Sequence, residues 1–523
     1  MTAGVAGEVA LAKARDQVEE AHEKIRLARR EFMKLFGFGG AALLAAGGAR
    51  ASGAGNDAHR GGSPYASAWT FAPGLLYLQI GTTGASPQMV IRDFNANYQD
   101  IAQNPTAYFF GQQGWRNAIA PGFGCDPYEL VMSFNTTDGL FRIMLGLTWE
   151  SGDEIITTNM EESAGNSVLS LLADRYGVVV RPVAIPTSDA FSEDEVFRRF
   201  EAQYSSRTKA ILFSSPIYLT GTRLRERDLC LWAARKGILS IVDGAHQPGM
   251  IALNLHEMGC DFFSGAGHKW QCGPGQTGFM YLRNGYNPNP YVRTAPATDL
   301  GFLVPGGPTV DIPVPGYANT RPLPTYFPTN TLLYGASNGN AVLNKGQRSP
   351  DDNVAALLQL VGNGSRPSQN ALYECCHLWD QWGRANIEEY LVSVAQYLRA
   401  RLVSIWGPRS LAFPFSPHGS HASRVGLTSF NPFSPGYDYN ADLTPDMSAA
   451  QATAGAAAVS NLKDAFDIVV RTTTVPYSLR SNPAASAAPN ATSTPLRFST
   501  HLFHSTSDVD RLIDALLSVV PHP

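Results

Sequence analysis

The stretch ILSIVDGAHQPGMIALNLHEMGCDFFSGAGHKWQCGPGQTGFMYLR, residues 238–283, determines the fold that we expect. Its first apolar run ends at Asp243, and open α/β sheets bind their ligands at the carboxyl ends of strands. Lys269 follows 26 positions later in a glycine-rich turn, between His268 and Trp270. A lysine in a tight apolar and aromatic setting has the depressed pKa that Schiff-base chemistry needs. A strand-end aspartate can hold a pyridinium nitrogen protonated.

Around this stretch, short β-branched runs alternate with helical patterns from about residue 128 to 283. The clearest predicted strands are VVVRPVAIP, KAILFSS, GILSIVDG and GFMYLR, and RERDLCLWAARKG is a predicted helix between them. This alternation predicts an α/β fold with a mostly parallel sheet covered by helices.

The remaining segments predict a second, smaller α+β domain. Residues 284–352 lose the core period and are predicted to be a long insertion loop. Helical pattern returns at 368–406, followed by strand candidates RVGLTSF, FDIVVRTT and LRFST and by a closing helix. The Ala/Ser/Pro-rich segments 433–460 and 480–495 are predicted loops. We expect a linker and N-terminal arm at 52–85, a large domain at 86–380 and a small domain at 381–523.

Several motifs in the decisive stretch resemble the class V aminotransferase family, which includes cysteine desulfurases and isopenicillin-N-epimerase-like enzymes. They are Asp243-Gly244-Ala245-His246, Asp261-Phe262, His268-Lys269-Trp270, Gly273-Pro274 and Gly278-Phe279-Met280-Tyr281. The resemblance implies a fold-type-I enzyme that uses pyridoxal 5′-phosphate. By the same resemblance, Lys269 forms the Schiff base and Asp243 pairs with the ring nitrogen. His246 then lies near the phenolic oxygen and His268 contacts the phosphate.

Further site residues lie outside that stretch. Thr136 and Thr137 open an amphipathic helix, where hydroxyls and backbone N–H groups form a natural phosphate site. The family carries a similar Asn-Thr-Thr-acidic motif with that role. Gly364-Ser365 resembles the family pair that reaches the phosphate of a neighbouring subunit, so Ser365 predicts a homodimer. Arg497 resembles the arginine that binds the substrate α-carboxylate, a task suited to a planar fork; otherwise it is a strand-end arginine in a surface ion pair.

Two positions depart from the family pattern. Where relatives carry a histidine or aromatic ring stacked on the cofactor, the alignment places Glu162, whose carboxylate stacks poorly and alters proton transfer at the ring face. A shift of a few residues, or an aromatic ring from the insertion, is the alternative. Ala266 stands where some relatives have a phosphate-binding serine, and Ser264 is the expected substitute.

Composition excludes other classes of protein. The net charge is −4 without a basic block in the body of the chain, which argues against nucleic acid as a partner. The six cysteines include no CxxC pair, and no metal site is predicted. Residues 407–422 lack the cysteine that desulfuration needs on a mobile loop, so a desulfurase is not expected.

The first 51 residues resemble a twin-arginine export signal. Arg29-Arg30 precede Phe32 and Lys34, a short apolar run follows, and Ala49-Arg50-Ala51 provides a cleavage site. The alternative is an amphipathic helix with an Ala/Gly linker. The apolar run is too short for a stable membrane anchor, which needs about 20 residues. We therefore expect a periplasmic protein.

The expected activity is chemistry at the α-carbon of an amino acid or a similar amino substrate. As an exported member of the epimerase-like branch, this chain resembles the periplasmic pyridoxal-phosphate enzyme that tailors pyoverdine siderophores, whose chemistry is oxidative and uses O2. The alternatives are an aminotransferase or epimerase of a small amino acid, and a catalytically altered protein that only binds the cofactor.

Overall fold

The computed structural model describes residues 12–13, 15–17, 20, 63–105, 113–127, 129–283, 292–296, 309–313, 358–359, 364–416, 418–476 and 492–523. The predicted export signal thus falls almost wholly outside the described residues. So does most of the predicted insertion, of which the structure describes the antiparallel pair β9 (Val292–Pro296) and β10 (Thr309–Pro313). No helix in these ranges is long and apolar enough to cross a membrane.

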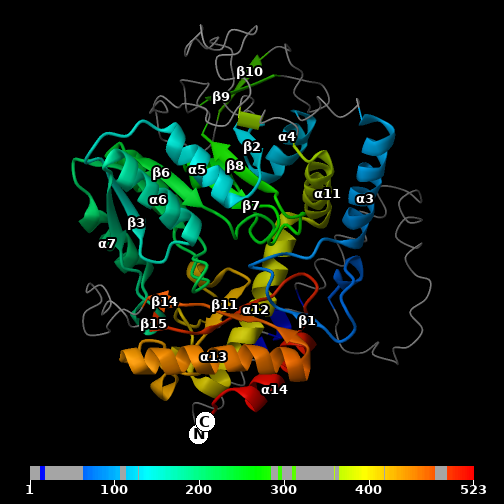
Figure 1. Cartoon of the computed structure of the whole chain (residues 1–523), viewed down its shortest axis with the longest axis vertical. Helices are drawn as coiled ribbons and strands as arrows, with labels where there is room; N and C mark the ends of the chain where they lie inside the picture. Colours follow the sequence, from blue (N-terminus) through cyan, green and yellow to red (C-terminus); the bar gives the residue numbers. More distant parts are fainter. Residues whose placement is uncertain are drawn as a thin grey trace.

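A seven-stranded sheet forms the centre of the larger, upper part of the molecule in Figure 1. Its order is β2-β8-β7-β6-β5-β3-β4, and only β8 runs antiparallel to its neighbours. The mostly parallel sheet and the four predicted strands within it are confirmed. The strand bounds are β2 (Leu130–Ser133), β3 (Glu154–Thr158), β4 (Val179–Val183), β5 (Thr208–Ser214), β6 (Leu239–Asp243), β7 (Phe262–Ala266) and β8 (Gly278–Leu282).

Both faces of this sheet are buried, which explains why its strands are continuous apolar runs in the sequence. In β5, Ile211 and Phe213 enter one hydrophobic core, whereas Ala210 and Leu212 enter the core on the other face. The period of two side chains along a strand produces this division. The helices of this part include α5 (Thr136–Gly146), α6 (Ser163–Tyr176), α7 (Glu193–Gln203), α8 (Glu226–Lys236), α9 (Leu255–Met258) and α4 (Gln113–Ile119).

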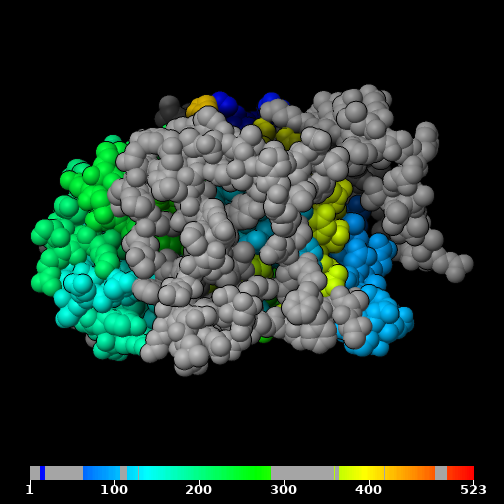
Figure 2. All heavy atoms as spheres, turned by 90° about the horizontal axis from the view of Figure 1, so that it is seen from above, coloured from blue at the N-terminus to red at the C-terminus, as the bar shows by residue number. Residues whose placement is uncertain are grey.

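Two helices that are far apart in the sequence pack together beside the large sheet. Seen from above, the blue α3 (Gln88–Gln103) and the yellow α11 (Arg366–Trp382) lie side by side at the right of the picture (Figure 2). Gly383, with a φ of 83°, separates α11 from α12 (Arg384–Trp406), which leads down into the smaller part (Figure 1). Positive φ is a conformation that glycine adopts without steric cost.

The smaller part is built on an antiparallel sheet of three strands, β11 (Leu427–Phe430), β16 (Leu496–Ser499) and β13 (Arg471–Thr472). Helices α12, α13 (Pro445–Phe466) and α14 (Thr506–Val519) accompany it. The N-terminal segment joins here, because β1 (Leu76–Tyr77) pairs with β12 (Ile468–Val469). A short pair, β14 (Val475–Pro476) and β15 (Thr492–Ser493), completes the part.

One expectation about this part is wrong. Most of the predicted loop at 433–460 belongs to α13, a helix of 22 residues. Alanine has the highest helix propensity, and Thr444 and Pro445 provide an N-cap and a favourable first position. Small residues are common in loops, but here they let the helix face with Gly455 pack closely against the side chains of Thr472 and Thr494.

The α13 N-cap can be tested by Thr444→Ala, since the Thr444 side chain accepts a hydrogen bond from the Met447 N–H at 3.2 Å. Removing this acceptor should lower the free energy of unfolding by about 1 kcal/mol. Thr453→Ala, at an exposed interior position of the same helix, is the control and should be neutral or slightly stabilising. Equal unfolding midpoints for Thr444→Ala and the control would contradict the cap.

Candidate active site

The candidate site lies at the carboxyl edge of the parallel sheet, where Asp243 ends β6. Asp243 is paired in register with Ser214, the last residue of β5. Its carboxylate is buried and accepts a hydrogen bond from the Ala245 N–H at 3.0 Å. Burial raises the pKa of Asp243 to about 6, although that hydrogen bond and Lys269 act in the opposite direction. The predicted strand-end position of Asp243 is confirmed.

Lys269 lies in the turn that joins β7 to β8. The N-terminal segment packs directly on this turn, because the Gly84 N–H donates to the His268 carbonyl at 2.7 Å. A Cβ on Gly84 would lie 1.9 Å from the Lys269 carbonyl oxygen, so only glycine permits this approach. The segment that contains Gly84 therefore lies in close contact with the lysine turn.

The surroundings of Lys269 favour a reactive amine. Burial lowers its pKa to about 8, assisted by Arg497 and Arg471 and opposed by the carboxylates of Asp243 and Glu162. Three of the predicted site residues, Asp243, Lys269 and Arg497, therefore lie near enough for the charges of Asp243 and Arg497 to affect the pKa of Lys269. A lowered pKa leaves a larger fraction of the amine unprotonated at neutral pH, which nucleophilic chemistry requires.

Both predicted histidines lie beside the lysine. His246 is buried, and its Nδ1 accepts a hydrogen bond from the Trp270 Nε1–H at 3.0 Å. Burial holds the pKa of His246 well below its ordinary value, so its ring is neutral. His268 is partly buried, with Nδ1 3.3 Å from the Thr277 carbonyl oxygen, and burial lowers its pKa as well.

The predicted phosphate position is the N-terminus of α5, which begins at Thr136 as expected. Asn135 caps the helix by accepting from the Asp138 N–H, so the Thr136 hydroxyl is not used as a cap. That hydroxyl is buried and has no hydrogen-bond partner within the described part of the chain, whereas Thr137 is exposed. The hydroxyl of Ser264 donates to the Thr136 carbonyl at 2.9 Å and supports the start of the helix.

Arg497 is accompanied by a second arginine that the sequence analysis missed. Arg471 on β13 lies directly opposite Arg497 on β16, and both guanidinium groups donate to the Thr82 hydroxyl at 3.2 Å. Arg497 also donates to the Tyr218 carbonyl at 2.9 Å. Neither arginine pairs with a carboxylate of the described residues, which excludes the alternative of a surface ion pair there. The sequence did contain a signal for Arg471, because FDIVVRTT (residues 466–473) predicts a strand that includes it.

The burial of Arg497 beside a second, partly buried cation points to an anion. Arg497 is 1% exposed, and burial and the neighbouring Arg471 lower its pKa to about 9. Its Nε is buried and lacks an acceptor among the residues that the structure describes. Buried like charges without a counter-charge are costly, and a carboxylate would offset that cost.

Glu162, the departure from the family pattern, is the N-cap of α6. Its carboxylate accepts from the Ala164 N–H at 2.7 Å and from the Ser163 hydroxyl at 2.5 Å. Burial acts to raise the pKa of Glu162, but these bonds and Lys269 lower it below the ordinary value. The residue is therefore an ionised group beside Lys269, and its contact with a cofactor ring stays a prediction.

The neighbouring Glu161 was not predicted at all. Its buried carboxylate accepts from the hydroxyls of Thr158 and Ser214, each at 2.5 Å, and from the Ser214 N–H at 3.1 Å. Burial raises the pKa of Glu161 to about 7, and the charge of Asp243 adds to the rise. Two carboxyl groups thus lie close together behind the site. The sequence alone shows two adjacent glutamates without distinguishing their environments.

Ser365, the residue expected to reach a neighbouring subunit, is the exposed N-cap of α11 and accepts a hydrogen bond from the Ser368 N–H at 3.4 Å. Its predicted contact with a second copy stays a prediction.

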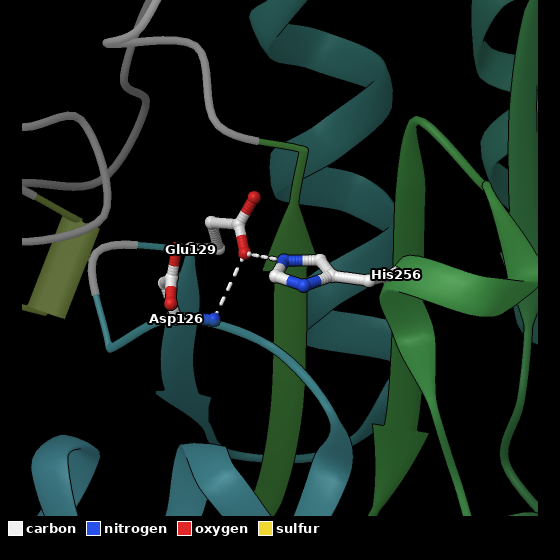
Figure 3. A group of neighbouring side chains, drawn as sticks. All are labelled: Asp126, Glu129 and His256. Carbon is white, nitrogen blue, oxygen red and sulfur yellow. Dashed lines mark hydrogen bonds and ion pairs between the residues drawn. The ribbon is translucent and has the colours of Figure 1, made fainter. Parts of the chain in front are cut away.

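A separate polar cluster joins Asp126, Glu129 and His256 near the start of β2, at the opposite edge of the sheet (Figure 3). Their potential ligand atoms lie within 4.8 Å of one another. Glu129 Oε2 is 2.5 Å from His256 Nε2 and also accepts from the Asp126 N–H. These bonds already use the glutamate oxygen that a metal ion would need, and they connect the loop before β2 to α9.

The buried Glu161 makes stability depend on pH. Between the ordinary pKa of 4.5 and the folded value of about 7, the folded chain keeps a proton that the unfolded chain has released. Its contribution to stability therefore falls as pH rises through that window. As pH rises from 4.5 to 7, the free energy of unfolding of Glu161→Gln should increase relative to that of the wild type by more than about 1 kcal/mol. Glu150→Gln, at an exposed position, is the control; a pH-independent difference for Glu161→Gln would contradict the burial of an acid there.

Known proteins are similar to this chain over part of its length. Residues 76–290 match the model of the family "Aminotransferase class-V". Isopenicillin N epimerase of Streptomyces clavuligerus is 28% identical over 218 residues, which are 41% of this chain and 54% of the relative. Probable cysteine desulfurase 2 of Mycobacterium leprae is 28% identical over 233 residues, 40% and 52% of the two chains. The chain thus spans little more than half the length of these curated relatives.

Solved structures match over a larger share of the chain. The cystine C-S lyase C-DES, in complex with its reaction product cysteine persulfide, has a TM-score of 0.59 at 18% identity, covering 85% of this chain and 98% of the other. A cysteine desulfurase from Thermococcus onnurineus has a TM-score of 0.57 at 18% identity, covering 85% and 94%. The fold is that of fold-type-I pyridoxal-phosphate enzymes, and residues 76–290 match the class V aminotransferase family within it.

Proposed function

We propose that this protein is a pyridoxal-5′-phosphate-dependent enzyme that acts at the α-carbon of an amino acid or a similar amino group. The observation that carries the proposal is the convergence of Lys269, Asp243 and Arg497 at the carboxyl edge of the sheet. An amine, an acid and an unpaired guanidinium are the groups that an amino-acid cofactor enzyme needs.

The described residues fit the cofactor. The N-terminus of α5, with the unpartnered hydroxyl of Thr136, suits a phosphate. The buried Nε2 of His246 is likewise unpartnered and lies in the field of Lys269. Buried polar groups in proteins are normally hydrogen-bonded, so these two atoms indicate a polar ligand between α5 and the lysine turn.

Pyridoxal phosphate supplies an electron sink for the substrate α-carbon when it is bound. Asp243 would hold a proton on the ring nitrogen, and Glu161 behind it would disfavour loss of that proton by adding negative charge. The amine of Lys269 would bind the cofactor covalently and, once released, move a proton at the α-carbon. Glu162 would act as an ionised group near that amine.

The substrate would be held through a carboxylate. Arg497 has an unpartnered Nε and no carboxylate partner in the described residues, and Arg471 adds a second positive charge beside it. A planar guanidinium binds a carboxylate through two parallel hydrogen bonds. An amino acid with a free α-carboxylate is therefore the proposed substrate class.

Two reactions remain as candidates within this chemistry. Isopenicillin N epimerases among the relatives favour epimerisation. The predicted export signal favours oxidative tailoring of a siderophore or another secondary metabolite. Desulfuration is less favoured, because all six cysteines are buried and burial raises the pKa of Cys272 and Cys375. Chiral analysis of products together with O2 uptake would distinguish epimerisation from oxidation.

Export and assembly belong to the proposal as well. The Arg29-Arg30 pair supports a twin-arginine signal, and that route carries folded proteins, so the cofactor could be loaded before export. Ser365, at the start of α11, supports a homodimer with shared sites through its resemblance to the family pair.

Lys269→Ala should abolish covalent capture of pyridoxal phosphate, because no other residue is proposed to bind it covalently. Borohydride reduction followed by intact-mass measurement would show the cofactor on the wild type but not on this variant. Lys463→Ala, which removes an exposed lysine on α13, is the control and should keep the adduct. Equal labelling of Lys269→Ala and the wild type would leave only a non-catalytic binding protein or an unrelated function.

Arg497→Lys should retain the positive charge but lose the two-point fork. The expected loss in kcat/KM is about 2–4 kcal/mol, or roughly 30- to 1000-fold, for a substrate with an α-carboxylate. The corresponding decarboxylated amine should show little change, which provides an internal control. Comparable use of acid and amine by the wild type would exclude a free α-carboxylate from this position.

A fusion of residues 1–55 to a reporter should be exported, and replacing Arg29-Arg30 with two lysines should block export. Cell fractionation provides the measurement. A reporter that stays in the cytoplasm with the native arginine pair would refute the periplasmic location.

A further inference from the structure

The contact between Trp270 and His246 determines which nitrogen of the histidine carries the proton. The indole Nε1–H lies 3.0 Å from His246 Nδ1, and both side chains are buried. An indole nitrogen can only donate, so Nδ1 must be the unprotonated acceptor. Burial keeps the ring neutral. A neutral histidine with an unprotonated Nδ1 carries its proton on Nε2.

That Nε2–H has no acceptor in the described part of the protein. His246 is 2% exposed, and its Nε2 is buried without a hydrogen-bond partner. Among the charges that lower the pKa of His246 are those of three cations, Lys269, Arg497 and Arg471. A buried donor among cations calls for an oxygen acceptor with negative charge from a ligand.

Trp270 is itself held rigidly, as a positioning residue must be. Its carbonyl accepts from His501 Nε2 at 2.9 Å, and the two rings stack with centroids 5.8 Å apart at 29°. The backbone of the small part also confines the indole, because a Cβ on Gly426 would lie 2.6 Å from its Cζ3. The indole therefore has one orientation, with its N–H aimed at His246.

We propose that Trp270 is a positioning residue that holds His246 as the Nε2–H tautomer, which keeps an N–H donor available for the phenolic oxygen that the family resemblance places beside His246. The inference rests on the proposed function. A donor at that oxygen stabilises its anionic form and fixes the rotation of the ring. A histidine with the proton on Nδ1 would present a lone pair instead and would repel the same oxygen.

The tautomer can be measured without cofactor. Nitrogen-15 NMR of protein labelled at its 11 histidines, with His246 identified by its absence in His246→Gln, reports which ring nitrogen is protonated. The expected result is protonation at Nε2 in the wild type and a shift toward Nδ1 in Trp270→Phe. Trp379→Phe is the matched control, because its buried indole N–H donates to the Gly249 carbonyl instead. Protonation of His246 at Nδ1 in the wild type would overturn the proposal without any variant.

The acceptor is identified by comparing pyridoxal phosphate with its 3-deoxy analogue, which lacks the phenolic oxygen. The wild type should bind pyridoxal phosphate about tenfold more tightly than the analogue, and Trp270→Phe should lose most of that preference. In a His246→Gln background, Trp270→Phe should have little further effect, since glutamine has no tautomer to select. Equal binding of the two ligands by the wild type would overturn this inference while leaving the proposed function intact. Failure of the wild type to capture pyridoxal phosphate at Lys269 would instead refute the proposed function.

Discussion

The burial of opposite charges at the carboxyl edge of the sheet is the constraint on which the rest of this structure depends. Asp243 is placed there by β6, and Lys269 by the turn after β7. Burial raises the pKa of the acid to about 6 and lowers that of the amine to about 8, while each moderates the shift of the other. Without Lys269, the buried carboxyl group of Asp243 would lose a neighbouring positive charge that lowers its pKa. Burial disfavours the charged forms of both groups, and a polar ligand bound beside them would offset part of this desolvation free energy.

The two parts of the chain meet at this site. The large sheet supplies the acid and the lysine turn, whereas β13 and β16 of the small part supply Arg471 and Arg497. The N-terminal segment connects them, since Thr82 accepts from both arginines and Gly84 rests on the lysine turn. This packing requires glycine at position 84, because a Cβ there would collide with the Lys269 carbonyl oxygen.

Three buried polar atoms from different elements, the Thr136 hydroxyl, His246 Nε2 and Arg497 Nε, have no hydrogen-bond partner among the residues that the structure describes. The charge of Lys269 acts on His246, and that of Arg497 acts on Lys269. Native proteins leave few such groups unsatisfied, and those that remain usually mark a function. Under the proposed function, each atom would make a different contact: Thr136 with a phosphate at a helix N-terminus, His246 with a ring oxygen and Arg497 with a carboxylate.

The sequence by itself determined the parallel sheet, its strand-end aspartate, the lysine turn and the helix at Thr136, because these depend on local period and on residues close in the chain. It misjudged α13, where alanine-rich composition looked like a loop although the propensity favoured a helix. Only the tertiary structure decided that Glu161 is buried and Glu162 is a cap, that Arg471 accompanies Arg497, and that Trp270 orients His246. Those relations join residues distant in the sequence, and burial and hydrogen-bond direction arise only when the strands and turns come together.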